Sequence, residues 1–375
     1  MNIITVLLKL ITIFIGLCGF GLLVAIHEFG HFLFCKLFAI RTPSFSIGYG
    51  PTLISKKIGD TLFSLSLLPF GGYVEIAGNE EVGQGEQLHA HDNDEGSFKN
   101  KKLYQKLLVM GGGIIANIGL CYIILLIVFL IGAPASPWLS PYTTSNIIEK
   151  VNTLKDPELL LMAGDVIKKI DSVDVSTQPQ TIVTLIKKSP CQTFMFEVER
   201  ASIPLSLPVT VHACSCKPDA SGYLDISLKA QAITSLPLGH ALYASWTVMS
   251  HLAFTIFRSI KMMCERVTLQ GAGGPLLILT EGIKTAESGF LLFTLLIAFL
   301  SVNLAIVNLI PLPILDGGQM LTLIIESIIG KELPEKTRMV VHLVCWGLMI
   351  LLMLYLTYQD ILALIPTIKG WFIHA

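Results

Sequence analysis

The sequence predicts a polytopic α-helical membrane protein with about four transmembrane helices, a membrane-associated β-hairpin or sheet, and one polar α/β domain inserted between the second and third helices. The chain of 375 residues is 53% hydrophobic and only 14% charged, whereas soluble domains carry about a quarter charged residues. Its mean hydropathy is +0.69. Four apolar runs each reach about 20 residues, the length that an α-helix needs to cross a ~30 Å hydrocarbon core. These runs are 3–26, 107–131, 290–314 and 339–358.

The first predicted element is a transmembrane helix within residues 1–40. A cleaved signal peptide is the alternative, but such a segment has an apolar core of about 7–15 residues and a small-residue cleavage site. Here the apolar run is longer, contains a single charge at Lys9, and continues directly into His27-Glu28-Phe29-Gly30-His31. We therefore expect a helix that stays in the membrane.

Residues 41–106 are predicted to form β-structure followed by a loop. In 41–78, Ser alternates with Phe, Ile and Leu between Gly and Pro residues, which is typical of short strands or a hairpin. The stretch 78–97 is acidic, rich in Gly and without periodicity, so we expect a mobile loop. The basic, amphipathic stretch 98–108 then leads into a second transmembrane helix, predicted over 107–133.

The polar middle of the chain, 134–232, is predicted to be a small α/β domain. Short β-branched runs surround one helical segment at 181–189. The following segment, 233–288, begins with an amphipathic, aromatic-bearing pattern typical of an interfacial helix. A third transmembrane helix is predicted over 289–320, and 321–375 is predicted to hold a cytoplasmic loop and the fourth helix.

Basic residues in the short loops predict the topology. Segment 41–106 and the 315–338 loop carry most of the lysines and arginines near the spans, so both are expected in the cytoplasm. Both chain ends and the inserted domain then lie outside, where a disulfide between Cys191 and either Cys214 or Cys216 could persist. The net charge of −1 says nothing about partners, and no basic patch suggests nucleic acid. The four apolar runs make the lipid bilayer the expected partner.

The motif at 27–31 has the spacing of a metal site. His27 and His31 are four residues apart and share one helix face, so both imidazoles can bind one zinc ion while Glu28 reaches its water. Zinc accepts two imidazoles and one carboxylate and lowers the pKa of bound water to about 7, and a glutamate can take and return the proton. Chance is the alternative, but ionisable groups in a membrane span are costly and are usually functional.

Asp316 is the best candidate for the third ligand. It is the only acid in or beside the third span, and the predicted topology puts it toward the same leaflet as His31. Capping of a helix by an Asp-Gly pair is the alternative role.

Pro311 and Pro313 are predicted to interrupt this span, which is tolerated only inside protein or beside a water-filled cavity. Asn117, Asn303 and Asn308 lie in apolar runs and could bind an unwound substrate backbone. They could equally hold the helices together.

The two motifs "HEFGH" and "NLIPLPILDGG" resemble those of the site-2 protease family of intramembrane zinc metalloproteases, and the chain is similar to its bacterial regulator-of-sigma-E protease branch. "LPFGGYV" and "GGPLLI" support the resemblance. It implies that His27, His31 and Asp316 bind zinc and that Glu28 is the general base. It also matches Asn303, Asn308 and Pro311 to polar and helix-breaking positions of the family. The 41–78 strands correspond to its β-hairpin, which is thought to hold a substrate as an added strand.

The inserted domain resembles a PDZ domain. The segment "LLMAGDVIKKIDSVDV", 160–175, is similar to the PDZ pattern AGDxIxxINGxxV, with Gly164, Asp165 and Ile167 in place. Only one such domain fits the available length. The resemblance implies a peptide or protein ligand for this domain.

The sequence therefore predicts a zinc endopeptidase of the bacterial inner (cytoplasmic) membrane. It would cut single-span membrane proteins resembling anti-sigma factors, or signal-peptide remnants, within the membrane. The active site would lie toward the cytoplasm and the PDZ-like domain outside. A non-catalytic PDZ scaffold is one alternative, although it would not need Glu28. A zinc transporter is another, although transporters usually show internal repeats, which we do not find here.

Overall fold

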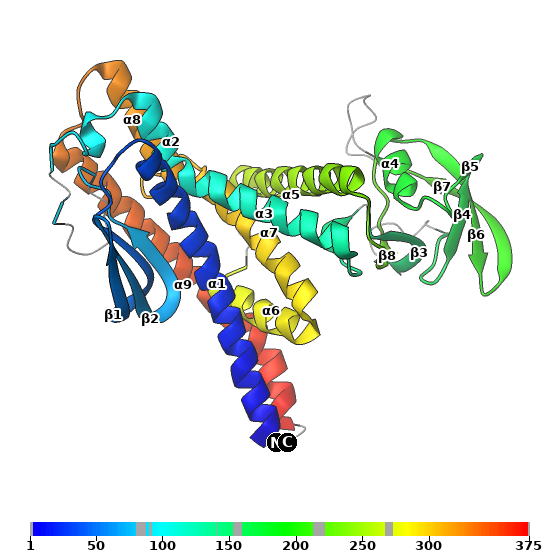
Figure 1. The fold of residues 1–375 in the computed structure, drawn as a ribbon. Helices are drawn as coiled ribbons and strands as arrows, with labels where there is room; N and C mark the ends of the chain where they lie inside the picture. The colour runs from blue at the N-terminus through cyan, green and yellow to red at the C-terminus, as the bar shows by residue number, and fades with distance from the viewer. Residues whose placement is uncertain are drawn as a thin grey trace. The chain divides into compact units, whose positions relative to one another are not determined.

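The computed structural model describes residues 3–79, 88–89, 92–140, 142–152, 160–212, 222–266 and 273–373. The chain divides into two compact units (Figure 1). One comprises residues 1–125 and 249–375, and the other residues 126–248. Each is described by itself.

The first unit contains the apolar helices. In the described part of the chain, four helical stretches are long and apolar enough to cross a membrane, in agreement with the predicted number. They lie in α1 (Ile3–Leu37), α3 (Gly112–Ile131), α7 (Phe290–Asn308) and α9 (Glu335–Ile373). α3 and α7 contain no charged residue, so their sides can all contact lipid or other helices.

Two glycines let α1 and α3 approach each other closely. A Cβ atom added to Gly30 would collide with the main chain of Gly112, and one added to Gly112 would lie 2.6 Å from the carbonyl oxygen of Gly30. A larger residue at either position would push the helices apart. The contact places the start of α3 beside the second half of the 27–31 motif.

The predicted β-structure is present as β1 (Ser44–Ile58) and β2 (Thr61–Val74), which lie beside α1 (Figure 1). The start of β1 pairs with both ends of β2, because Phe45 lies opposite Phe63 and also opposite Val74. The rings of Phe32, Phe45 and Phe63 contact one another and join the strands to α1. The hairpin is therefore packed directly on the helix that carries the histidines.

The stretch 78–97, predicted to be a mobile loop, lies partly outside the described residues, at 80–87 and 90–91. Its described end is held in place, because Arg41 forms ion pairs with Asp92 and Asp94 and the Ser97 hydroxyl donates to the Asp92 carbonyl. The 3₁₀ turn η1 (Phe98–Asn100) and α2 (Leu103–Met110) then lead to α3.

The predicted third transmembrane helix is shorter than 289–320. α7 ends at Asn308, and Asp316 begins a separate helix, α8 (Asp316–Ile329). Pro311 and Pro313 cannot continue the backbone hydrogen bonding of a helix, which explains the break. The prediction of a loop over 315–338 was thus largely wrong, because the amphipathic stretch after Asp316 forms a helix.

The segment 233–288 contains two helices, α5 (Leu238–Arg266) and α6 (Pro275–Ser288). The predicted helix over 237–262 is confirmed by α5, whereas its place at the membrane interface stays a prediction. α6 was not predicted as a separate element. Pro275 begins it, a position where the missing N–H costs nothing.

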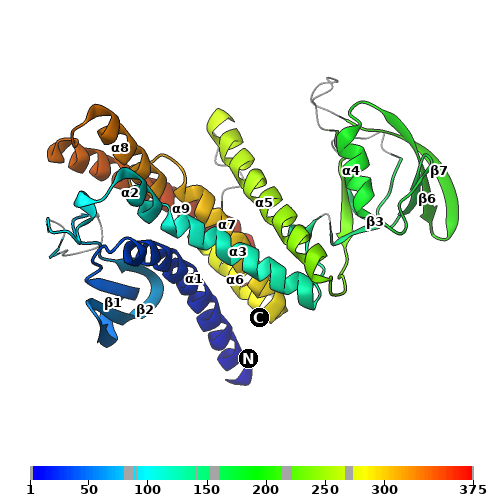
Figure 2. The same cartoon turned by 45° about the horizontal axis from the view of Figure 1, so that its top comes forward.

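The second unit is the predicted α/β domain. Its elements are the 3₁₀ turn η2 (Pro137–Leu139), β3 (Thr144–Val151), β4 (Val166–Ile170), β5 (Val173–Asp174), α4 (Gln180–Lys188), β6 (Thr193–Arg200), β7 (Ile203–Thr210) and β8 (Ile226–Ala230). The antiparallel sheet has the order β7-β6-β4-β3-β8, with β5 paired to β4. α4 packs on the sheet (Figure 2), and Ile182 of α4 joins Ile148, Ile167 and Phe196 in the buried core.

Candidate metal centre

Two histidines and one aspartate converge in the first unit. The Nε2 atoms of His27 and His31 are 3.3 Å apart, and both side chains are buried. The Oδ2 atom of Asp316 lies 3.3 Å from His27 Nε2 and 3.6 Å from His31 Nε2. Within the described residues, this is the only cluster of three or more metal-binding side chains whose ligand atoms come this close together. The structure thus brings together the three residues predicted to bind zinc.

The turn between α7 and α8 aims Asp316 at the histidines. A Cβ atom on Gly317 would collide with the carbonyl oxygen of Leu309, and one on Gly318 with that of Leu312. Only glycine therefore lets the start of α8 pack against the turn that precedes it. This explains the two glycines after Asp316.

The cluster fits a metal ion. Asp316 Oδ2 is buried and accepts no hydrogen bond from the described residues, an arrangement that is costly unless a cation lies beside it. Two imidazoles and a carboxylate are a donor set that zinc accepts, with a fourth position left for water or substrate. Gly113 of α3 borders the same space, because its added Cβ would lie 2.6 Å from both His27 Nδ1 and His31 Nε2.

The second nitrogen of each histidine ring also has a neighbour. His31 Nδ1 lies 2.8 Å from the carbonyl oxygen of Val109, which can only accept, so Nδ1 is the protonated nitrogen. In the neutral imidazole, Nε2 then has the lone pair, and this atom faces Asp316. His27 Nδ1 lies 3.1 Å from the side-chain amide of Asn117. Contacts of this kind orient metal-binding imidazoles.

Glu28 lies on the hairpin side of α1. Its side chain is half-buried, and a Cβ atom added to Gly72 of β2 would be 3.8 Å from Glu28 Cγ. Glu28, the predicted general base, therefore directly follows His27 in the chain and borders β2, which belongs to the hairpin predicted to hold the substrate.

The residues predicted to bind substrate lie in different surroundings. The Asn308 amide nitrogen is 3.4 Å from His27 Nε2, whereas Asn117 is completely buried. Asn303 lies five residues before Asn308, about 140° around α7, and has no hydrogen bond to either histidine among those of the described residues. Pro311 is exposed in the turn between α7 and α8. Their contacts with substrate stay predictions.

Sequence reasoning did not identify Val109 and Gly113 as part of the site. Val109 contributes only a main-chain carbonyl, which leaves no mark in its residue type. The run of three glycines at 111–113 was the one available signal for Gly113.

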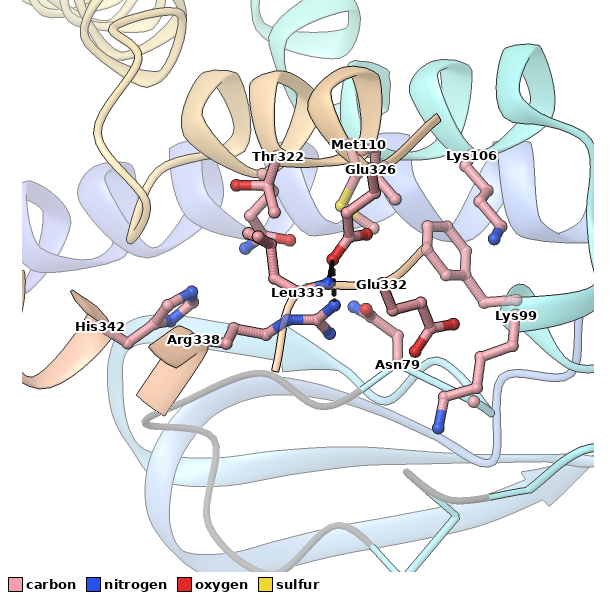
Figure 3. A pocket seen from close by; sticks show the side chains of 14 residues that line it. Asn79, Lys99, Lys106, Met110, Thr322, Glu326, Glu332, Leu333, Arg338 and His342 are labelled. Carbon is pink, nitrogen blue, oxygen red and sulfur yellow. Dashed lines mark hydrogen bonds and ion pairs between the residues drawn. The ribbon is translucent and has the colours of Figure 1, made fainter. Parts of the chain in front are cut away.

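A cavity of about 250 Å³ lies between α2, α8 and α9. Figure 3 shows Glu326 of α8 directed toward Leu333 and Arg338. Glu326 accepts hydrogen bonds from the Leu333 N–H (2.9 Å) and the Arg338 guanidinium (2.6 Å), which holds the corner between α8 and α9. Burial lowers the pKa of Lys106 at the cavity wall, although Glu332 and Glu326 oppose the shift. The corner supports the helix that begins at Asp316.

The second unit has a cavity of about 350 Å³ of its own. Val183, Ile186 and Lys187 of α4 line one side, and Ile226 and Leu228 of β8 line the other. Among the described strands, β8 is at the edge of the sheet, where a strand can accept a further chain.

Comparison with known proteins gives a consistent result. The family model described as peptidase family M50 matches residues 15–354. A relative in Clostridium perfringens, whose name describes a zinc metalloprotease, is 30% identical over 93% of this chain and 98% of its own length. Zinc metalloprotease RasP of Geobacillus kaustophilus is 26% identical and regulator of sigma-E protease RseP of Escherichia coli is 25% identical. Both alignments cover 91% of this chain and 96% of the relative.

Proposed function

This chain belongs to peptidase family M50, the site-2 protease family of zinc metalloproteases, and we propose that it cleaves single-span membrane proteins or signal-peptide remnants within the bilayer. It is an integral-membrane zinc metalloendopeptidase. The observation that carries the proposal is the convergence of His27, His31 and Asp316 beside helices that are apolar enough to span a membrane.

In the proposed reaction, His27, His31 and Asp316 hold the metal. When bound, zinc lowers the pKa of a coordinated water to about 7 and polarises the substrate carbonyl. Glu28 takes the proton from the attacking water and delivers it to the leaving amide nitrogen. Glu28 directly follows His27 in the helix, and its side chain borders the hairpin strand that would hold the substrate.

The hairpin supports an extended substrate. A peptide bond inside a membrane helix is shielded by the helix itself, so the substrate must unwind before it is cut. Among the described residues, β1 and β2 pair only with each other, which leaves the outer edges of this sheet for an added strand. Because Gly72 borders Glu28, a strand added there would pass beside the base. Asn308, Asn303 and Pro311 would then bind the unwound backbone.

Helix directions support a site near one membrane face. The end of the span in α1, the start of α3 and the turn after α7 all lie at the metal centre. Four spans that alternate in direction would bring these three helix ends to the same membrane face. The lysines and arginines of the adjoining loops favour the cytoplasmic face of a bacterial inner membrane. Cys191 is disulfide-bonded, which favours an extracytoplasmic place for the inserted domain.

The inserted domain is proposed to be a PDZ-like peptide-binding module. The cavity between α4 and the edge strand β8 supports this proposal, because a peptide added to β8 could place side chains against Val183 and Ile186. Its ligand would be a peptide end or a protein segment.

Replacing Glu28 by Gln tests the proposed reaction in the full-length protein in lipid vesicles. We expect cleavage of a single-span model substrate to be lost while the zinc content stays at the wild-type level, because Gln cannot take the proton. Glu281→Gln, a change of the same kind on α6, is the control and should leave cleavage intact. Cleavage by the Glu28→Gln protein would show that the assigned base is wrong. Wild-type protein that moves zinc across the vesicle membrane without cutting the substrate would favour the transporter instead.

A further inference from the structure

We infer that Asn117 is a positioning residue whose side-chain oxygen accepts a hydrogen bond from Nδ1–H of His27 and thereby holds the His27 Nε2 lone pair toward the metal. The inference rests on the proposed metal-binding role of His27. Asn117 is on α3, and its side chain is completely buried against the His27 ring.

The hydrogen-bond capacity of the ring carries the first step. One amide nitrogen lies beside each nitrogen of His27: Asn117 Nδ2 is 3.1 Å from Nδ1, and Asn308 Nδ2 is 3.4 Å from Nε2. A neutral imidazole has one N–H and only one lone pair, so it cannot accept a hydrogen bond from both amides. One of the two amides must therefore present its oxygen.

The metal centre identifies Asn117 as that residue, because His27 Nε2 must keep its lone pair for the ion and Nδ1 then carries the proton. Its Oδ1 atom is buried without a hydrogen-bond partner among the described residues. The oxygen and nitrogen of an amide are nearly equal in size, so a half-turn of the group exchanges them without changing the packing. Oδ1 then accepts from Nδ1–H, and the Nε2 lone pair faces His31 and Asp316, where the ligand atoms gather.

The main chain of Asn117 is also fixed. The Ser301 hydroxyl of α7 donates to the Asn117 carbonyl at 2.8 Å, and both residues are completely buried. α7 leads into the turn before Asp316, so this bond joins the helix that orients His27 to the helix before the third ligand. His31 has a corresponding arrangement, because the Val109 carbonyl accepts from its Nδ1–H.

Burial separates this role from substrate binding. With none of its side chain exposed, Asn117 could reach a substrate backbone only if the His27 ring moved away. An action through His27 needs no such movement. Residues in this position typically alter metal affinity by about 10–100-fold when they are replaced.

Two substitutions of nearly equal size test the inference. Asn117→Asp keeps an oxygen at the same position and removes the N–H donors, whereas Asn117→Leu removes both. The purified full-length proteins in detergent would be titrated with a zinc chelator, and retained zinc would be measured by atomic spectroscopy. We expect Asn117→Asp to hold zinc as tightly as wild type or more tightly, and Asn117→Leu to release it at about 10–100-fold lower chelator strength.

An equal loss of zinc affinity in both variants would overturn the inference, because the oxygen acceptor kept by Asn117→Asp would then have no effect. Zinc affinity that is undiminished in Asn117→Leu would overturn it as well. If the Asn117→Leu protein does not fold, Asn117→Ala is used in its place. Tenfold weaker zinc binding by Asn117→Asp is by itself sufficient to reject the proposal. His31→Ala in the same titration tests the metal centre itself. Zinc retained by that variant would contradict the proposed function, whereas zinc lost there with no effect at Asn117 would contradict only this inference.

Discussion

His27 Nε2 and Asp316 Oδ2 lie 3.3 Å apart, although the first residue belongs to the first helix and the second begins a helix after the third span. A buried carboxylate oxygen without a hydrogen-bond partner, this close to two imidazole nitrogens, fits a cation bound among the three groups.

Asp316→Asn should strongly reduce zinc binding, because the amide loses the negative charge that the metal requires. Zinc content per purified chain checks this. Asp360→Asn is the control, because Asp360 is a buried acid of the first unit that accepts its hydrogen bonds from the N–H groups of Gly274 and Leu277. The control should keep its zinc. Equal zinc contents in the two variants would remove Asp316 from the site.

Gly113→Ala should weaken zinc binding and cleavage together. The added methyl group would lie 2.6 Å from His27 Nδ1 and His31 Nε2, so at least one ring must move. Gly119→Ala on the same helix meets no atom within 4 Å and gains about 1 kcal/mol of helix propensity. Chelator titration and substrate cleavage compare the two. A zinc affinity that is unchanged in Gly113→Ala would show that the rings have more room than the structure gives them.

The ion pair between Asp165 and Arg200 should make the inserted domain sensitive to acid. Burial alone raises the pKa of Asp165, but hydrogen bonds from Arg200 and from the Met162 N–H, together with the Arg200 charge, bring it below its ordinary value. A lowered pKa in the folded state stabilises the domain above the ordinary pKa of about 3.9, and this stability is lost as the pH falls through the folded value.

Asp165→Asn should accordingly destabilise the domain by about 1.5–3 kcal/mol at pH 7, the usual contribution of a hydrogen bond to a charged group. The difference from wild type should shrink below pH 4. Hydrogen exchange of the β4 and β6 amides in the full-length protein measures it. Glu149→Gln, at an exposed position of β3 beside β4, is the control. A difference that does not change with pH would contradict the assigned pKa.

Cys191 should resist thiol labelling when the protein is unfolded without reductant, because it is disulfide-bonded. Cys18, Cys35, Cys121 and Cys345 are free and should be labelled under the same conditions. Peptide mass spectrometry before and after reduction separates the two groups and identifies the partner of Cys191. Full labelling of Cys191 before reduction would argue against an oxidising compartment for this domain.

Several features of the site were predictable because they depend on local sequence. The helical period of 3.6 residues puts His27 and His31 on one face whatever surrounds them. The lengths of the apolar runs indicated four spans, and Asp316 was identifiable because it is the only acid near its span. The alternating pattern after Arg41 was sufficient to predict β1 and β2.

Other features depend on which helix faces meet. Nothing in the residue types around Val109 and Asn117 shows that both lie against the histidine rings, because that contact follows from the close approach of Gly30 and Gly112. The division of the predicted third span into α7 and α8 was also only partly foreseeable: the prolines indicated a break, but the helix after Asp316 was mistaken for a loop.

The sequence by itself determined the membrane class, the zinc-binding motif and the candidate for a third ligand, because apolar length, helical spacing and the rarity of charge in lipid are properties of short segments. Only the tertiary structure decided how the ligands are oriented. Their orientation depends on contacts between helices far apart in the chain, and these contacts exist only after the glycines at the crossing and the turn before Asp316 have brought the backbones together.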